Sequence, residues 1–167
     1  MEATKAKVVG PEDGKSGFLG SIGVRFMIDG AETDGGFSLV EHPMSPRALA
    51  APLHKHNRED EYSYVLEGKM GALLGDEVLT AEAGDLVFKP RDQWHTFWNA
   101  GDEPARILEI ISPGGFEKFF ERMTQMGPDT TIEEREALAN EYGLEFDLEP
   151  VPALIEEHGL EFPMIDA

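Results

Sequence analysis

Short apolar runs separated by turn-forming residues fill the first two thirds of the sequence and limit the folds open to the chain. Each run has the length of a strand and is rich in Val, Ile, Tyr, Phe or Trp. The clearest runs are SIGVRFMID, GFSLVEH, EYSYVLEG, MGALLG, EVLTA, DLVFKP, WHTFWNA and ARILEIIS. Many short strands in close succession predict an all-β sandwich or barrel over residues 18–111. The segments LLGDEVLTA and WNAGDEPARI predict hairpins that turn at Gly-Asp pairs.

The pattern changes at the segment SPGG, residues 112–115. Apolar residues then recur at a helical spacing, namely Phe116, Phe119, Phe120 and Met123. A second helix is predicted to start at a capping box formed by Thr131 and Glu134, and PALIEEHG predicts a third. We therefore expect a β-barrel with N-terminal strands over residues 1–112. A C-terminal helical extension, residues 113–167, is expected to pack on it.

Charge and composition exclude several classes of function. The chain has 33 acidic residues against 14 Lys and Arg, a net charge of -19, whereas nucleic-acid binding needs clustered basic residues. No apolar run of about 18 residues is present, which predicts no membrane span. The first residues lack the apolar core of a signal peptide, so we expect a cytoplasmic protein. Because cysteine is absent, any bound metal must be held by nitrogen and oxygen.

The segment HKHNREDEYSYVLEG, which begins at His54, gathers side chains that bind metals. Residues two apart on a strand point to the same side, so His54 and His56 share a face and suit one ion. A carboxylate from the next strand can reach the same point. Spacing alone leaves Glu59, Asp60 and Glu61 as alternatives.

A third histidine, His95, lies in PRDQWHTFWN between two tryptophans. Taken alone, such a residue is more often part of a packed core than a ligand. Together with His54 and His56, at the start of another predicted strand, it indicates a three-histidine metal site.

These residues resemble the two sequence motifs of the cupin superfamily. The first motif is Gly, five residues, His-x-His, three or four residues, Glu, six residues and Gly. This sequence has His54, His56, Glu61 and Gly68 in that register, and Ala48 where the first glycine is usual.

The second motif is Gly, five residues, Pro-x-Gly, two residues, His, three residues and Asn. Here Gly84, Pro90, His95 and Asn99 match, and Asp92 replaces the glycine after the proline. The two departures concern backbone turns and leave the ligands intact.

The resemblance implies a single-domain cupin of the cupin 2 type. Its fold would be an all-β cupin barrel, also called a double-stranded β-helix or jelly roll, with the motifs over residues 48–99 and C-terminal α-helices outside. The implied ligands are His54, His56, Glu61 and His95. They would hold one divalent transition metal per chain, with nickel, iron, manganese, cobalt, copper and zinc all open. Glu59 and Asp60 would be solvated neighbours of Glu61.

Strand phase predicts which side chains face the interior around the ion. These are Ala50, Pro52, Ser63, Val65, Phe97 and Asn99. The predicted pocket is mostly apolar and contains no Lys or Arg. It therefore favours a small or flat organic substrate over a strongly anionic one.

The segment SPGGFEKFFERM is similar to the tail of quercetinase-like cupins. That resemblance implies a dioxygenase acting on a flavonol-like or other enolisable small molecule, with dioxygen as co-substrate and Glu61 as both ligand and base. Two alternatives stay open: an isomerase, decarboxylase or hydrolase in which the metal is a Lewis acid, and a non-enzymatic binding cupin. The residues favour an enzyme without fixing the reaction. The resemblance also implies a homodimer, paired through sheet edges or exchanged N-terminal strands.

Overall fold

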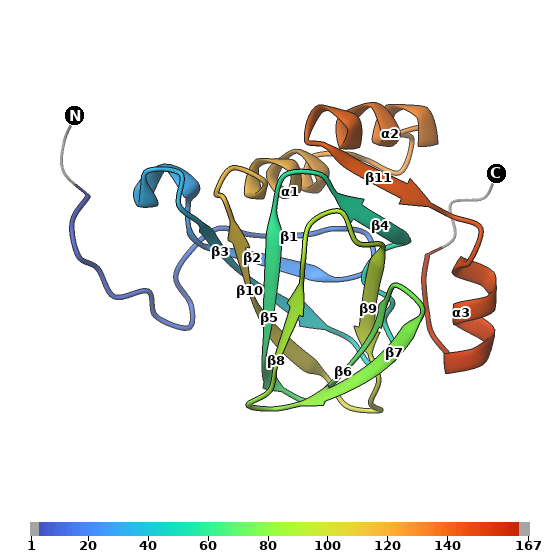
Figure 1. Cartoon of the computed structure of the whole chain (residues 1–167). Helices are drawn as coiled ribbons and strands as arrows, with labels where there is room; N and C mark the ends of the chain where they lie inside the picture. The colour runs from blue at the N-terminus through green and yellow to red at the C-terminus, as the bar shows by residue number, and fades with distance from the viewer. Residues whose placement is uncertain (1–3, 164–167) are drawn as a thin grey trace.

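The computed structural model describes residues 4–163 and places its strands in two antiparallel sheets (Figure 1). The six-stranded sheet has the order β1 (Ser16–Phe18), β2 (Gly23–Ile28), β3 (Ser38–Met44), β10 (Ala105–Ser112), β5 (Asp60–Glu67) and β8 (Leu86–Lys89). The five-stranded sheet has the order β11 (Leu144–Asp147), β4 (Leu53–His56), β9 (His95–Asn99), β6 (Lys69–Leu74) and β7 (Glu77–Glu82). The expected all-β barrel architecture is confirmed.

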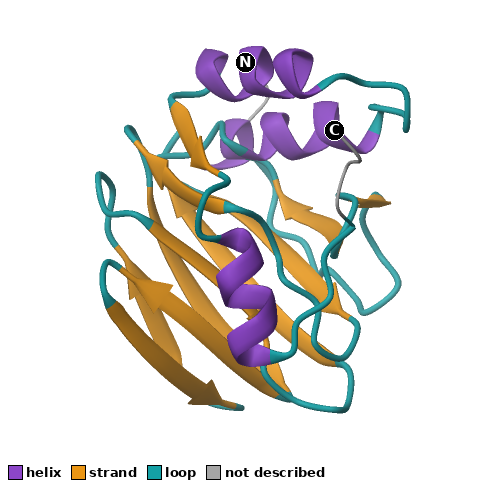
Figure 2. Ribbon diagram, turned by 90° about the vertical axis from the view of Figure 1, so that its right-hand side faces the viewer, coloured by secondary structure: helices purple, strands orange, loops and turns teal. Residues whose placement is uncertain are grey.

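Three α-helices and one 3-10 helix complete the described chain. They are η1 (Gly30–Thr33), α1 (Glu117–Thr124), α2 (Ile132–Glu141) and α3 (Val151–His158). α1 and α2 lie at one end of the sheets, and α3 lies beside the five-stranded sheet (Figures 1 and 2). The predicted capping box is present, because Thr131 accepts from the Glu134 amide and the Glu134 side chain accepts from the Thr131 amide. No described helix combines the length and apolar character needed to cross a membrane.

The space between the sheets is filled by two apolar layers. The first lies deep in the barrel and includes Val65, Met70, Phe97 and Ile107. The second lies under α1, where Phe116 and Phe119 pack against residues of β2, β3 and β10. Inward and outward positions alternate along β5 and β10, as antiparallel strands with one buried face require. Charged side chains occupy the level between the two apolar layers and are described below.

Two expectations about connections need correction. The segment around Gly75 forms the predicted hairpin between β6 and β7, but the segment around Gly101 does not join paired strands. It leads from β9 in one sheet to β10 in the other. The prediction failed because turn residues indicate that the chain reverses but not which strand the next strand pairs with. The C-terminal part also contains a strand, β11, which pairs with β4 and was not predicted.

The backbone conformation at two motif positions explains which residue types occur there. Asp92 has a φ of 63°, and Asp tolerates this left-handed conformation better than most residues, so it can replace the usual glycine. Its amide donates to the carbonyl of His56 at 2.8 Å, which ties the turn before β9 to the end of β4. Gly68 has a φ of 78°, and a Cβ added there would lie 2.8 Å from the Ala105 Cβ.

Gly84 and Gly68 differ in why an alanine would destabilise them: backbone strain alone at Gly84, and strain plus a steric clash at Gly68. Gly84 has a φ of 96° but no atom within 4 Å of an added Cβ. We expect Gly84→Ala to lower the free energy of unfolding by about 1–2 kcal/mol through backbone strain. Gly68→Ala should lose at least about 1 kcal/mol more, because Ala105 must also move. Urea unfolding of both variants measures the difference, and equal losses would contradict the close approach at Gly68.

Candidate metal centre

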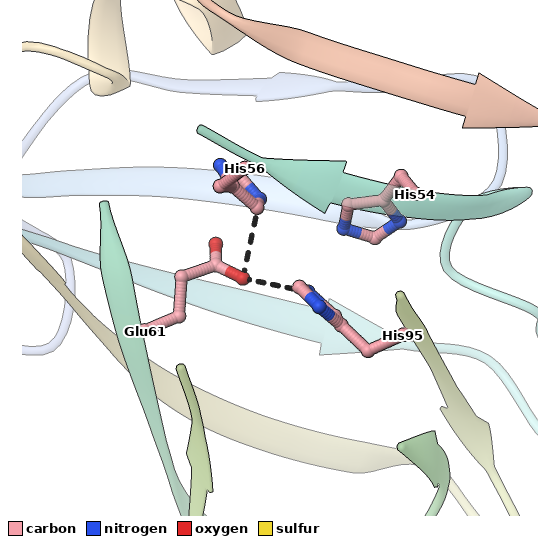
Figure 3. Close-up of side chains that lie close together, drawn as sticks. All are labelled: His54, His56, Glu61 and His95. Carbon is pink, nitrogen blue, oxygen red and sulfur yellow. Dashed lines mark hydrogen bonds and ion pairs between the residues drawn. The ribbon is translucent and has the colours of Figure 1, made fainter. Parts of the chain in front are cut away.

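Strands from both sheets bring His54, His56, Glu61 and His95 together at one end of the barrel (Figure 3). β4 supplies the first two histidines, and the neighbouring β9 supplies His95, whose Cα pairs with that of His54. Glu61 lies on β5 in the other sheet, and its side chain points toward the imidazoles. All four residues are buried, with exposed fractions of 7%, 2%, 4% and 1% in chain order. The four ligands implied by the sequence motifs are therefore neighbours in the structure.

One carboxylate oxygen, Glu61 Oε2, contacts two of the three imidazoles. Glu61 Oε2 lies 3.0 Å from His95 Nε2 and 3.3 Å from His56 Nε2. The ring of His54 completes the group, with its centroid 4.3 Å from that of His95. Donor atoms from the four residues all lie within 4.8 Å of one another. Since metal–ligand bonds of this kind are about 2.0–2.2 Å long, small side-chain movements suffice to enclose one ion.

Outer hydrogen bonds fix how two of the imidazoles are presented. His54 Nδ1 lies 2.9 Å from the Pro52 carbonyl oxygen, and His95 Nδ1 lies 3.0 Å from that of Gln93. A carbonyl oxygen can only accept, so each Nδ1 donates and each Nε2 is left to bind a cation. Backbone carbonyls in this role are typical of metal-binding histidines.

Burial and neighbouring charges set the protonation of the group. Burial, helped by His95 and His56, holds the pKa of His54 well below its usual value, so this ring is neutral at pH 7. Burial also opposes a charge on His56, but Glu61 and Glu59 outweigh it and raise the pKa of His56 to about 9. For Glu61, burial favours the neutral acid, yet His56 and Lys89 hold its pKa well below the usual value. A cation entering near neutral pH must therefore displace a proton from His56.

Glu59 corrects one expectation from the sequence. It was expected to be a solvated neighbour of Glu61, but it is 6% exposed and its Oε2 lies 3.4 Å from His56 Nδ1. Only Asp60 has the expected surface position, where it pairs with Arg91. Glu59 thus lies on the Nδ1 side of His56, where His54 and His95 have backbone carbonyls instead.

A buried charged chain runs from Glu61 into the barrel. Lys89 on β8 is 1% exposed, and its Nζ lies 3.4 Å from Glu61 Oε2 and 2.8 Å from Glu109 Oε1. Ser63 donates to Glu109 Oε2 at 2.6 Å. The Lys89 ammonium also lies 4.5 Å from the centre of the Phe97 ring. The expectation of an interior without Lys or Arg is therefore wrong.

The group fits a divalent cation on two grounds. Three imidazoles and one carboxylate are the nitrogen and oxygen donors that first-row transition metals accept. Three carboxyl groups are buried here against one ammonium: Lys89 contacts Glu61 and Glu109, and Glu59 lies beside His56. His56 Nδ1 and Glu59 Oε2 are buried 3.4 Å apart and have no hydrogen-bond partner. A divalent ion would balance the charge of this interior.

Aromatic rings surround the histidines. Phe116, at the start of α1, has its ring centre 4.5 Å from that of His56. Phe146 on β11 lies 6.2 Å from His54, measured in the same way. The four ligands beneath these rings are between 1% and 7% exposed. The candidate centre is thus enclosed by the C-terminal segment.

The predicted pocket residues have different surroundings. Ser63 belongs to the charged chain, Phe97 lies under Lys89, and Val65 lies in the deep apolar layer. Asn99 Nδ2 donates to the carbonyls of Ser45 and Glu103, and its Oδ1 accepts from the Gly101 amide. Pro52 supplies the carbonyl that orients His54. A substrate-lining role for these residues stays a prediction, and the contacts of Asn99 indicate that it holds the loop between the sheets.

The Lys89–Glu109 pair makes a prediction about stability. Lys89→Met leaves Glu109 buried without its counter-charge, and we expect a loss of about 3–5 kcal/mol in the free energy of unfolding. The double variant Lys89→Met/Glu109→Gln removes both charges and should recover most of that loss. Chemical unfolding of the two variants measures this. A double variant as unstable as the single one would show that the pair is not what holds these strands together.

Comparisons with known proteins agree with this geometry. Residues 41–111 match the family model described as "Cupin domain". The tetracenomycin polyketide synthase protein TcmJ of Streptomyces glaucescens is 35% identical over 60 residues, which are 36% of this chain and 40% of TcmJ. The matched region thus spans about two fifths of the length of that curated relative.

Two solved structures extend the likeness beyond the motifs. The polyketide cyclase RemF of Streptomyces resistomycificus is 30% identical with a TM-score of 0.56, and the match covers 65% of this chain and 80% of RemF. An RmlC-like cupin from Shewanella frigidimarina is 17% identical with a TM-score of 0.56, covering 69% of this chain and 98% of that one, which shows the fold alone. The chain belongs to the cupin family, because it matches the cupin family model and is 30% identical to RemF over 80% of that protein.

Proposed function

We propose that this chain is a metal-dependent enzyme that binds an enolisable carbonyl compound beside His54, His56 and His95 and uses Glu61 to move a proton. The observation that carries the proposal is the position of Glu61. Its buried, ionised carboxylate lies across from all three imidazoles, within 3.3 Å of two of them. A carboxylate in this position can bind a cation through one oxygen and accept a proton through the other.

The metal and the residues have separate tasks. A bound divalent transition ion supplies Lewis acidity toward a substrate oxygen. His54, His56, His95 and Glu61 hold that ion. The contacts described for Glu61 involve Oε2, so Oε1 is the atom that would take the proton. His56 and Lys89, both within 3.4 Å of Oε2, keep the carboxylate charged by lowering its pKa.

The polyketide relatives support an enolisable substrate. RemF is named as a polyketide cyclase, and TcmJ is named as a polyketide synthase protein. Polyketide intermediates are chains of carbonyl groups whose intervening carbons lose protons readily. Phe116 is packed in the core, whereas Phe146 beside His54 is half-buried and offers an apolar face to a flat molecule of this kind. These points favour Lewis-acid chemistry on a polycarbonyl compound over the dioxygenase reaction.

The dioxygenase of quercetinase type is the second candidate. The donor set favours it, because three imidazoles and one carboxylate leave open positions on a redox-active ion. The two candidates use the same residues and the same class of enolisable substrate. They differ in whether dioxygen is consumed.

The prediction for Glu61 tests the proton-transfer role. Glu61→Gln keeps the size and one acceptor oxygen but removes the basicity. It should retain much of the bound metal while losing about 100- to 10,000-fold in turnover. A suitable readout is exchange of the central C–H of a 1,3-diketone with deuterated water, catalysed by the metal-loaded protein. Wild-type exchange in Glu61→Gln would rule out the base role.

Two neighbouring variants are matched controls for that experiment. Asp60→Asn changes an exposed ion pair and should leave both metal affinity and exchange unchanged. Glu59→Gln changes the support of His56 and should weaken metal binding about 10-fold. Conversion of the diketone to product, followed in aerobic and in sealed anaerobic vessels, separates the two candidates, because proton exchange alone needs no oxygen in either. Turnover that continues without oxygen supports Lewis-acid chemistry, and turnover that stops while the aerobic reaction consumes oxygen supports the dioxygenase.

A further inference from the structure

Strand β11 continues the face of the five-stranded sheet that carries the candidate ligands. Its register with β4 pairs Leu144 with His56 and Phe146 with His54. Directly opposite residues of antiparallel strands point to the same side of a sheet, so both apolar side chains stand beside the imidazoles. Leu144 is buried, whereas Phe146 is half-buried with its ring centre 6.2 Å from that of His54. The C-terminal segment thus supplies one wall of the candidate metal centre.

The other walls of the centre are held from more than one side. Phe116, beside His56, is buried and stacks on Phe119 within the apolar layer under α1. In the opposite sheet, β5 is paired with β10 on one side and with β8 on the other. β11 has only four residues and lies at the edge of its sheet, where it pairs with β4 (Figure 1). Among these walls, β11 is the one that can separate without breaking a strand pair on its other side.

Polar contacts at the surface hold β11 to β4. Lys55 Nζ lies 2.7 Å from Glu145 Oε2, and these two side chains are 24% and 48% exposed. Just before the strand, the amide of the exposed residue Asn57 donates to the Gly143 carbonyl at 2.8 Å. An exposed ion pair contributes little stability, because water can replace each partner. The outer side of this strand pair is therefore weakly held compared with the apolar core.

We propose that β11 is the gate of the metal centre, and that it separates from β4 to admit first an ion and then a flat substrate past Phe146. The four ligands are buried, so a wall must move before a molecule as large as a diketone reaches them. Phe146 is a ring beside the ligands that solvent already reaches in part, which places the entrance on its side. Local separation of a short edge strand is an opening of the kind that gates enclosed sites. The passage of substrate rests on the proposed function, whereas the opening of the strand does not.

A reversible cross-link between β4 and β11 tests the gate. The chain has no cysteine, so Lys55→Cys/Glu145→Cys introduces two thiols at directly opposite positions and no others. In the oxidised form, we expect cobalt(II) uptake by the metal-free protein to slow at least about 10-fold, and reduction should restore it. The visible absorption of the bound cobalt measures uptake. The same cross-link should slow amide hydrogen exchange in residues 144–147, which is a readout that needs neither metal nor turnover.

Lys69→Cys/Glu82→Cys is the matched control for the cross-link. Lys69 and Glu82 are also a directly opposite lysine and glutamate in the same sheet, with Nζ 3.5 Å from Oε1. They join β6 to β7, the strand at the other edge. Both cross-links constrain the unfolded chain, but only the first one locks β11. Cobalt uptake should therefore be the same in the oxidised and reduced forms of the control.

A single substitution tests the gate without a cross-link. Glu145→Lys places two ammonium groups opposite each other across β4 and β11, where like charges weaken strand pairing. We expect cobalt uptake to become about 3-fold faster or more, because the strand separates more often. Circular dichroism verifies that the variant is folded. Uptake no faster than that of the wild type would contradict the gate.

The cross-linked proteins give three further results that decide the proposal. Cobalt uptake at the same rate in both forms of Lys55→Cys/Glu145→Cys, with exchange in β11 slowed, would overturn it and place the entrance elsewhere. Equal slowing by both cross-links would also overturn it, because general stiffening would then explain the effect. Uptake that depends on the first cross-link, in a protein that never exchanges the diketone proton, would support the gate and count against the proposed function.

Discussion

The burial of Glu59, Glu61 and Glu109 between two sheets is the constraint on which the rest of this structure depends. An isolated carboxylate in a protein interior loses its hydration and would take up a proton unless a cation compensates it. Lys89 compensates part of this charge, and a proton on His56 does so in the metal-free protein. A divalent ion held by the histidines would supply the rest. The centre is therefore both the expected site of chemistry and a condition for the stability of the strands around it.

Strand pairing brings this interior together from distant parts of the sequence. β4 and β9 place His54 and His95 side by side, and β5, β8 and β10 bring Glu61, Lys89 and Glu109 together in the other sheet. The Asp92 amide bound to the His56 carbonyl ties the turn before His95 to the strand of the first two histidines. The C-terminal segment then closes the site with Phe116 and with β11. Relaxing any of these contacts would move a ligand or admit water.

The ligands could be predicted from the sequence because their motifs fix both residue type and spacing. His54, His56, Glu61 and His95 came from the register of the motifs, and Phe116 and Phe119 from helical periodicity. Lys89 and Glu109 were missed because both faces of their strands are apolar, so alternation did not show which side is internal. The one sequence feature that could have indicated their burial is a charged residue within an apolar run, as in DLVFKP and ARILEIIS. Glu59 was misplaced because a residue between strands is normally solvated, and only the fold turns it toward His56.

We propose that His54, His56, Glu61 and His95 bind one divalent transition metal ion. Elemental analysis of protein loaded with metal and then desalted tests this most directly. We predict close to one ion per chain in the wild type and most of it lost in His56→Ala and in His95→Ala, because each removes one of four donors. His158→Ala, which alters a histidine stacked on Trp98 outside the centre, should keep the full amount. Full metal content in both His56→Ala and His95→Ala would contradict the account.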